Sequence, residues 1–117
     1  MGDADPDLTI YEKPTCSTCR SLFTLLTDRG IDFERVDYTV DPLSASQIQE
    51  LLAKAGLRPR DVVRMKEPDA RQLSLDDDQA VLAALEANPE LLQRPIVVRG
   101  DRAVLARPPE RVLELFP

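Results

Sequence analysis

The chain carries two cysteines, Cys16 and Cys19, where a short apolar run gives way to a helical pattern. It has no other cysteine and no histidine. Two thiols three positions apart cannot cross-link a domain, and a zinc site would need four ligands, of which only two good ones exist. Histidine-based acid–base catalysis is excluded as well. The chain must therefore fold by burying its own apolar residues, and its cysteines indicate thiol redox or thiol nucleophilic chemistry.

The pattern around the cysteine pair predicts a strand, a helix and a second strand. Residues 8–11 are apolar and β-prone, and Pro14 ends that run just before the cysteines. Apolar residues at helical spacing follow over 17–29, and Gly30 lies where a helix C-terminal glycine is expected. Residues 31–39 alternate in polarity, as a strand does. Such a strand–helix–strand unit joins two parallel strands.

The rest of the chain predicts a helical insertion over about 43–90, followed by two strands and a helix. Ser44 and Gln47 match a capping box at the start of a helix. The expected elements are a helix to Ala55 ended by Gly56, a short helical turn at 59–63, a helix around 81–88, strands at 96–98 and 103–106 joined by a hairpin turn at 99–102, and a helix over 109–116. The order is that of the thioredoxin-like fold. We therefore expect a single α/β domain over residues 1–117, with a small mixed four-stranded sheet flanked by helices.

Composition limits the classes of partner. The net charge of −6 disfavours nonspecific binding to nucleic acid or to an anionic membrane. No apolar run approaches the roughly 18 residues of a membrane span. The acidic residues 1–7 do not have the apolar core of a signal peptide. We expect a cytoplasmic monomer with no nucleic-acid or membrane partner.

The position of Cys16 favours a reactive thiol. It falls at the strand-to-helix junction, where free backbone N–H groups and the helix dipole stabilise an anion. A thiol pKa near 8.5 can fall to between about 3.5 and 7.5 at such a place. Lys13 and Arg20 are near enough in sequence to help. Cys19 lies deeper in the helix and is better placed as a second, resolving thiol; the plainer alternative is a pair of inert buried cysteines.

Arg94 and Pro95 lead into the third expected strand. Proline at the start of a strand has no N–H to give to the sheet. In thioredoxin-like folds this position is a cis-proline that faces the active cysteine, so we expect a cis Arg94–Pro95 bond. Arginines at 64, 94 and 107 are candidates for binding an oxyanion, because a guanidinium is planar and always charged. Taken alone, each is more often a solvated surface charge, and spacing alone does not select these three arginines.

Nearly the whole chain resembles the arsenate reductase family of thioredoxin-like proteins, whose relatives include Spx-type transcription regulators. The motifs that carry the resemblance are Tyr11-x-x-Pro14-x-Cys16-x-x-Cys19-Arg20, Asp61-Val62-Val63-Arg64, Asn88-Pro89-x-x-Leu92-x-Arg94-Pro95-Ile96-Val97-Val98 and Arg107-Pro108. The resemblance implies that Cys16 attacks arsenate while Arg64, Arg94 and Arg107 hold the oxyanion, for which sulfate and phosphate are mimics. We add Arg20 to this substrate-binding set. No tightly bound cofactor or metal is implied, and glutathione or another thiol is a co-substrate.

Two positions depart from the family pattern. Cys19 stands where these enzymes often have serine. Glu12 stands where some have a histidine that helps to ionise the nucleophile, whereas a glutamate would raise the pKa of the thiol. Lys13, Arg20 and the helix end would then have to activate Cys16.

The second thiol leaves three hypotheses open. In an arsenate reductase, either glutathione with glutaredoxin attacks the Cys16–arsenic adduct, or Cys19 does so and thioredoxin or glutaredoxin reduces the resulting disulfide. In a regulator of the Spx kind, the cysteine pair would be a redox switch on a protein that binds RNA polymerase; Arg107 argues against this. The third hypothesis is a general thiol–disulfide oxidoreductase without a role for arsenic.

Overall fold

The computed structural model of this chain describes residues 7–116. Residues 1–6, which contribute to the expectation that the chain has no signal peptide, lie outside that range. The elements, with η for a 3-10 helix, are β1 (Leu8–Glu12), α1 (Ser17–Asp28), β2 (Glu34–Asp37), α2 (Ala45–Ala55), η1 (Pro59–Val62), η2 (Pro68–Gln72), α3 (Asp78–Ala87), η3 (Pro89–Leu91), β3 (Ile96–Arg99), β4 (Arg102–Leu105) and η4 (Pro109–Leu115). None of the helices within 7–116 has both the length and the apolar character needed to cross a lipid bilayer.

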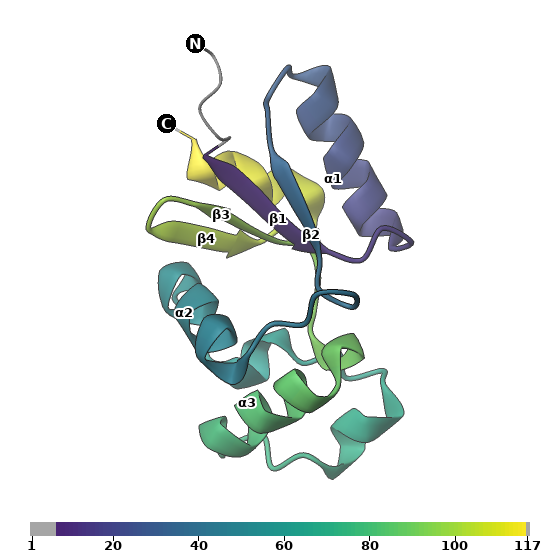
Figure 1. The fold of residues 1–117 in the computed structure, drawn as a ribbon, viewed down its shortest axis with the longest axis vertical. Helices are drawn as coiled ribbons and strands as arrows, with labels where there is room; N and C mark the ends of the chain where they lie inside the picture. Colours follow the sequence, from purple (N-terminus) through teal and green to yellow (C-terminus); the bar gives the residue numbers. More distant parts are fainter. Residues whose placement is uncertain (1–6, 117) are drawn as a thin grey trace.

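The four strands form one mixed sheet in the order β2-β1-β3-β4 (Figure 1). β1 pairs in parallel with β2, as the strand–helix–strand pattern predicts, and antiparallel with β3. β3 and β4 form the expected hairpin, whose turn lies between Arg99 and Arg102. The predicted α/β class and mixed four-stranded sheet are confirmed.

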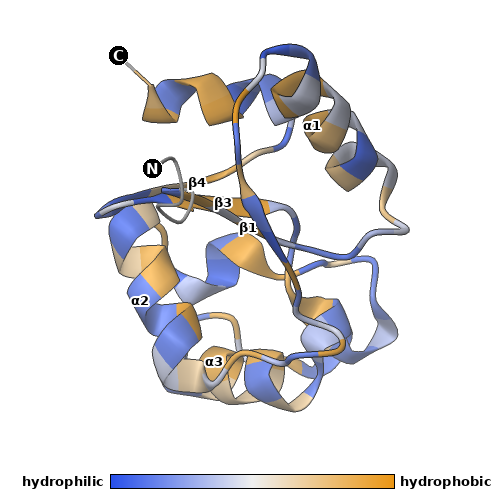
Figure 2. Ribbon diagram, turned by 45° about the horizontal axis from the view of Figure 1, so that its top comes forward, coloured by the Kyte–Doolittle hydropathy of each residue, from blue (hydrophilic) through white to orange (hydrophobic). Residues whose placement is uncertain are grey.

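Helices cover both faces of the sheet, and Figure 2 shows α1 and the C-terminal helix on one side with α2 and α3 on the other. Side chains alternate between the two faces, as the pleat of a strand requires. Ile10 and Val97 belong to the core under α1 and η4. Tyr11 and Ile96, one residue along each strand, pack with the core of the insertion. The active-site loop after β1 therefore emerges where the sheet meets the insertion.

Helix α2 begins and ends at the local signals that the sequence predicts. The Ser44 hydroxyl accepts a hydrogen bond from the Gln47 N–H at 3.1 Å, and the Gln47 side chain accepts one from the Ser44 N–H at 2.9 Å. Gly56 ends α2 with a φ of 68°, in the left-handed region that favours glycine. The capping box and the glycine stop are both confirmed.

Two elements differ from the prediction. The second strand is only Glu34–Asp37, not 31–39. The pairing of β2 with β1 runs from Glu34, opposite Thr9, to Asp37, opposite Glu12. After Asp37 the chain turns, because the Asp37 carboxylate accepts hydrogen bonds from the N–H and the hydroxyl of Thr39. The expected C-terminal helix is present, but as a 3-10 helix over Pro109–Leu115.

Candidate active site

Cys16 is the N-cap residue of α1. Its backbone N–H donates to the Lys13 carbonyl at 2.9 Å, and its own carbonyl accepts from the Arg20 N–H at 3.0 Å. The first bond closes the turn after β1, and the second starts the helix. The side chain is partly exposed, so the sulfur meets solvent and the N-terminus of the helix together.

The surroundings of Cys16 lower its pKa. Burial alone would raise the pKa, because it disfavours the charged thiolate. The backbone N–H of Cys19, the Cys19 thiol, the backbone N–H of Thr18 and the charge of Arg94 outweigh burial. The thiolate, which is the nucleophile, is therefore favoured at this position. The helix end thus contributes to the activation, as the sequence suggests, together with the Cys19 thiol and Arg94.

Cys19 has the opposite character. It is 1% exposed, and burial raises its pKa to about 12. Its interaction with Cys16 and the negative charge of Glu12 contribute to this raised pKa, whereas the backbone N–H of Lys13 opposes them. Both cysteines are free thiols. The structure therefore pairs an ionisable outer thiol with a protonated inner one.

Arg64 and Arg94 are brought side by side by a short antiparallel contact. Val63 and Leu92 form an isolated β-bridge, the Arg64 N–H donates to the Leu91 carbonyl at 2.7 Å, and the Gln93 N–H donates to the Val62 carbonyl at 2.8 Å. Both arginine side chains are buried, at 8% and 5% exposure. This single β-bridge thus brings two charged side chains, which are 30 residues apart in sequence, into one site.

Arg94 is held by groups that sequence reasoning missed. Its Nη1 donates to the Tyr38 hydroxyl at 3.2 Å, and that hydroxyl donates to the Leu92 carbonyl at 2.6 Å. Its Nη2 lies 3.4 Å from the Glu90 carboxylate. The sequence places Tyr38 only in a strand, and no pattern marks a buried tyrosine as the support of a distant arginine.

Arg107 joins the site through the β3–β4 hairpin. Its Nη1 donates to the Arg94 carbonyl at 2.8 Å. The Arg94–Pro95 peptide bond is cis, as predicted, and the Arg107–Pro108 bond is also cis, which was not predicted. The two arginines thus precede two cis-prolines at neighbouring strand ends.

Cys16 and the three arginines line one cavity of about 230 Å³. Its lining is Thr15, Cys16, Ser17, Thr18, Arg64, Lys66, Arg94 and Arg107. Four of these carry positive charge and none is acidic, although the chain as a whole has a net charge of −6. The Nε atoms of Arg64 and Arg94 are buried and have no hydrogen-bond partner within 7–116. The cavity is built to bind an anion next to a thiolate.

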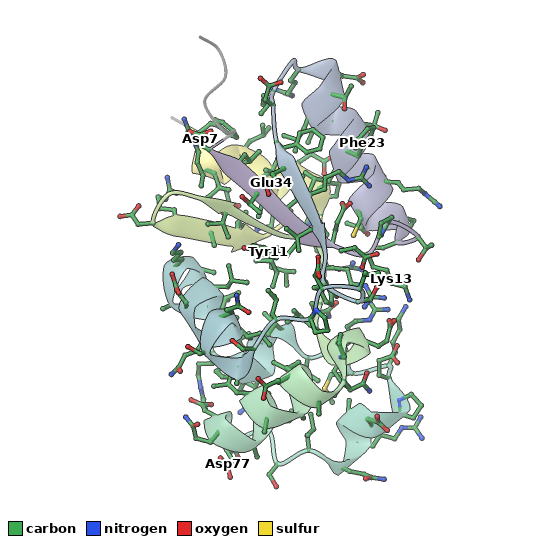
Figure 3. All side chains as sticks on the ribbon, viewed as in Figure 1. Asp7, Tyr11, Lys13, Phe23, Glu34 and Asp77 are labelled. Carbon is green, nitrogen blue, oxygen red and sulfur yellow. The ribbon has the colours of Figure 1, made fainter. Side chains whose placement is uncertain are left out.

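Two predicted contributors lie elsewhere. Arg20 does not line this cavity; it borders a separate open depression with Ser17, Ser21 and Thr24, because its helix position turns it away from the arginines. Lys13, labelled in Figure 3, lies just after β1. It pairs with Glu90, with 2.9 Å between Nζ and Oε2, so its charge is directed to that carboxylate. Lys66, which sequence reasoning did not select, takes a place in the lining.

Glu12 does not act on Cys16 in the expected way. Its side chain is 1% exposed and its Oε2 accepts a hydrogen bond from Arg35 Nε at 2.6 Å. The groups that set the pKa of Cys16 do not include Glu12, whereas those that raise the pKa of Cys19 do. Within 7–116, no cluster of three or more histidine, cysteine, aspartate or glutamate side chains is arranged to hold a metal ion.

Comparison with known proteins places this arrangement in a family. Residues 11–115, from the end of β1 to the last turn of η4, match the ArsC family. The chain belongs to the ArsC family. This confirms the resemblance that the motifs indicated.

Several ArsC-family relatives are similar over almost their whole length. The chain is 36% identical to an arsenate reductase of Neisseria meningitidis, covering 92% of this chain and 96% of that protein. It is 38% identical to the uncharacterized protein YfgD of Escherichia coli, covering 91% and 93%. The solved structure of an arsenate reductase from Vibrio cholerae superposes with a TM-score of 0.88 at 35% identity, covering 97% of this chain and 100% of that one.

Proposed function

We propose that this ArsC-family chain reduces arsenate to arsenite, with Cys16 as the nucleophile. The observation that carries the proposal is the single cavity in which a partly exposed thiol of lowered pKa meets Arg64, Arg94 and Arg107. Relatives that cover nearly the same length bear the name arsenate reductase, which supports the choice of anion.

The arginines would bind the oxyanion and place its central atom at the sulfur. Arg64 and Arg94 each have a buried Nε without a hydrogen-bond partner among the described residues, although the Glu67 carboxylate lies 3.9 Å from Arg64 Nε. A tetrahedral anion supplies acceptors in several directions. The N-terminal N–H groups of α1 add donors at Cys16. Four cationic side chains would stabilise the extra negative charge that develops as the thiolate attacks.

The proposed chemistry has two steps. The Cys16 thiolate attacks the arsenic of dihydrogen arsenate and a Cys16 sulfur–arsenic bond forms. The bond from arsenic to one hydroxyl breaks, and that hydroxyl leaves as water after taking the proton of the other hydroxyl. A second thiol then attacks the Cys16 sulfur. The sulfur–arsenic bond breaks with its electron pair on arsenic, arsenic(V) becomes arsenic(III), and the two sulfurs are oxidised to a disulfide.

The second thiol is either external or internal. Glutathione would form a mixed disulfide with Cys16 that glutaredoxin reduces. Cys19 would form an internal disulfide for thioredoxin or glutaredoxin, and its direct interaction with Cys16 supports this route. Both routes need a reducing compartment, so we place the reaction in the cytoplasm.

Coupled oxidation of NADPH tests the proposal. The purified chain is incubated with arsenate and either glutathione with glutaredoxin or thioredoxin with its reductase, and arsenite is measured directly. Wild type should produce arsenite in step with NADPH consumption, and Cys16→Ser should produce none with either system. Absence of arsenite from wild type with both systems would exclude the proposal.

A general thiol–disulfide oxidoreductase is the second candidate, and the Cys16–Cys19 pair favours it. Such an enzyme would reduce a small model disulfide at the same rate with or without arsenate. It would also tolerate loss of Arg64 and Arg107, since a disulfide substrate carries no oxyanion. The same assay therefore separates the two functions by their dependence on arsenate and on the arginines.

A further inference from the structure

Glu12 is a buried carboxylate that the proposed reaction does not use. Its side chain is 1% exposed, which is rare for glutamate unless it is paired. Arg35 pairs with only one oxygen, Oε2. The other oxygen, Oε1, is buried without a hydrogen-bond partner among the described residues. Such an atom reduces stability and therefore calls for a functional explanation.

The strand and the helix that follow one another place Glu12 beside Cys19. The side chains buried between them are Leu8, Ile10 and Glu12 on β1 and Cys19, Leu22 and Leu26 on α1. The four aliphatic ones share one core. Because α1 runs back along β1, the end of the strand lies beside the start of the helix (Figure 1). Glu12 and Cys19 are thus the layer of this interface closest to the nucleophile, and the Glu12 charge acts on the Cys19 thiol.

Cys19 cannot attack efficiently as it stands. Burial raises its pKa to about 12. At that pKa only about one thiol in 10⁵ is ionised at pH 7, and the thiolate is the attacking species. A group that removes the proton during the attack would relieve this deficit.

The other titratable groups around Cys19 are poor acceptors for its proton. Cys16 is already bonded to arsenic or to another sulfur when Cys19 attacks. Tyr38 uses its hydrogen on the Leu92 carbonyl and its oxygen on Arg94, and burial raises its pKa. Arg35, on the neighbouring strand, is a cation that holds Glu12 Oε2. The carboxylate of Glu12 is the remaining acceptor.

We propose that Glu12 accepts the proton of the Cys19 thiol as Cys19 attacks the Cys16 sulfur, which rests on the proposed resolving role of Cys19. The Cys19–Cys16 sulfur bond forms, and the bond from Cys16 to its arsenic or sulfur partner breaks. Its electron pair leaves with arsenic, as arsenite, or with the partner sulfur, as a thiolate. The two cysteines are oxidised, and the proton moves to the unpartnered oxygen of Glu12. Arg35 positions the carboxylate through the other oxygen.

A chromogenic disulfide, dithiobisnitrobenzoate, tests this step without arsenate. Added at less than one equivalent, it releases one coloured thiolate when Cys16 attacks and a second when Cys19 resolves the mixed disulfide. Glu12→Gln should leave the first release within about twofold and slow the second at least about tenfold at pH 7. Glu34→Gln makes the same change at an exposed position on β2 and should leave both unchanged. Because arsenate is absent, failure of arsenate reduction and failure of this proposal are separate results.

The sign of the effect separates proton transfer from simple electrostatics. The Glu12 charge raises the pKa of Cys19, so a purely electrostatic Glu12 would make the second release faster in Glu12→Gln. A faster or unchanged second release would overturn the proposal.

The wild-type chain gives an independent test that needs no variant. With a carboxylate acceptor, the second release should vary little between about pH 6 and pH 9. With a preformed thiolate it would rise about tenfold per pH unit, and such a rise would overturn the proposal. Glu12→Asp keeps a carboxylate and should recover part of the rate, which a loss of packing alone would not allow.

Discussion

Arg107 Nη1 donates a hydrogen bond to the backbone carbonyl of Arg94 at 2.8 Å. The two residues are 13 apart in sequence, and the β3–β4 hairpin brings them together. The backbone carbonyl of Arg94 therefore positions the guanidinium of Arg107. Because the same backbone segment pairs with the segment of Arg64 through the Val63–Leu92 bridge, a shift in any one of the three arginines is expected to move the others.

Replacing an arginine of the cavity should impair the use of arsenate. A hydrogen bond to a charged group contributes about 1.5–3 kcal/mol. At 1.4 kcal/mol per decade, Arg94→Ala should lower kcat/KM for arsenate at least roughly tenfold. Sulfate or phosphate should compete with arsenate in wild type. The oxyanion assignment is wrong if Arg64→Ala, Arg94→Ala and Arg107→Ala all keep the wild-type kcat/KM.

Arg20 provides a matched control for the cavity arginines. It lies on the first turns of α1, close to Cys16 in sequence, but it borders a different depression. Arg20→Ala removes the same charge and should change kcat/KM for arsenate by less than about threefold, because screening weakens an exposed charge outside the cavity. A loss as large as that of Arg94→Ala would show that Arg20 binds substrate, as the sequence suggested.

The lowered pKa of Cys16 should be visible in its alkylation. The thiolate reacts, so iodoacetamide should modify Cys16 before Cys19 at neutral pH, with a midpoint below that of an ordinary thiol. The Cys19 thiol helps to lower the pKa of Cys16, so Cys19→Ala should move that midpoint to higher pH. Peptide mass spectrometry across a pH series measures both. An unchanged midpoint in Cys19→Ala would mean that the helix end alone activates Cys16.

The sequence predicts the fold better than it predicts the site. Local signals mark the elements: a capping box at Ser44, a glycine at the end of α2, and alternation in the strands. Cys16 is also found locally, because the end of a strand and the start of a helix are both visible around it. The neighbouring positions of Arg64 and Arg94 cannot be found in this way, because an isolated β-bridge between Val63 and Leu92 produces no periodic pattern in the sequence.

The residues that hold the site in place are even harder to predict from the sequence. Tyr38 reaches Arg94 across 56 positions, and Glu90 reaches Lys13 across 77. The same ion pair explains why Lys13 is not available to Cys16, as its sequence position had suggested. Side-chain pairing over such separations depends on the packed insertion and is not encoded in any short motif.

Glu90 couples the loop of Lys13 to Arg94, and this coupling should depend on pH. The hydrogen bond from Lys13, more than the nearby Arg94, lowers the pKa of Glu90 from its ordinary value of 4.5. A lowered folded-state pKa stabilises the fold at neutral pH, and the contribution is lost as the pH falls through that lowered value. Glu90→Gln should therefore be less stable than wild type at pH 7, by less than about 1 kcal/mol for so exposed a pair. Urea unfolding should show the gap closing as the pH is lowered below 4.5 and through the folded-state pKa; a gap that persists once the carboxyl is protonated would contradict the ion-pair explanation.

Tyr38→Phe should affect both the stability of the fold and the use of arsenate. The hydroxyl is buried, donates to the Leu92 carbonyl at 2.6 Å and accepts from Arg94 Nη1 at 3.2 Å. Phenylalanine fills nearly the same volume but leaves both partners short of a hydrogen bond, which costs about 1–3 kcal/mol. Urea unfolding should show that loss, and the KM for arsenate should rise because Arg94 loses a fixed orientation. The Cys16 alkylation rate at neutral pH should change little, since the backbone N–H groups of α1 remain.

Tyr11→Phe is the control that separates support of Arg94 from any general effect of removing a tyrosine hydroxyl. Tyr11 lies on β1 and is half-buried, and its nearby charges are Glu34 and Glu50, which raise its pKa after burial does. Tyr11 is also not among the residues that line the arginine cavity. Tyr11→Phe should leave the KM for arsenate unchanged and the free energy of unfolding within about 0.5 kcal/mol of wild type. If both variants raise KM equally, Tyr38 does not position Arg94, and the hydroxyl contributes only to the packing of the insertion against the sheet.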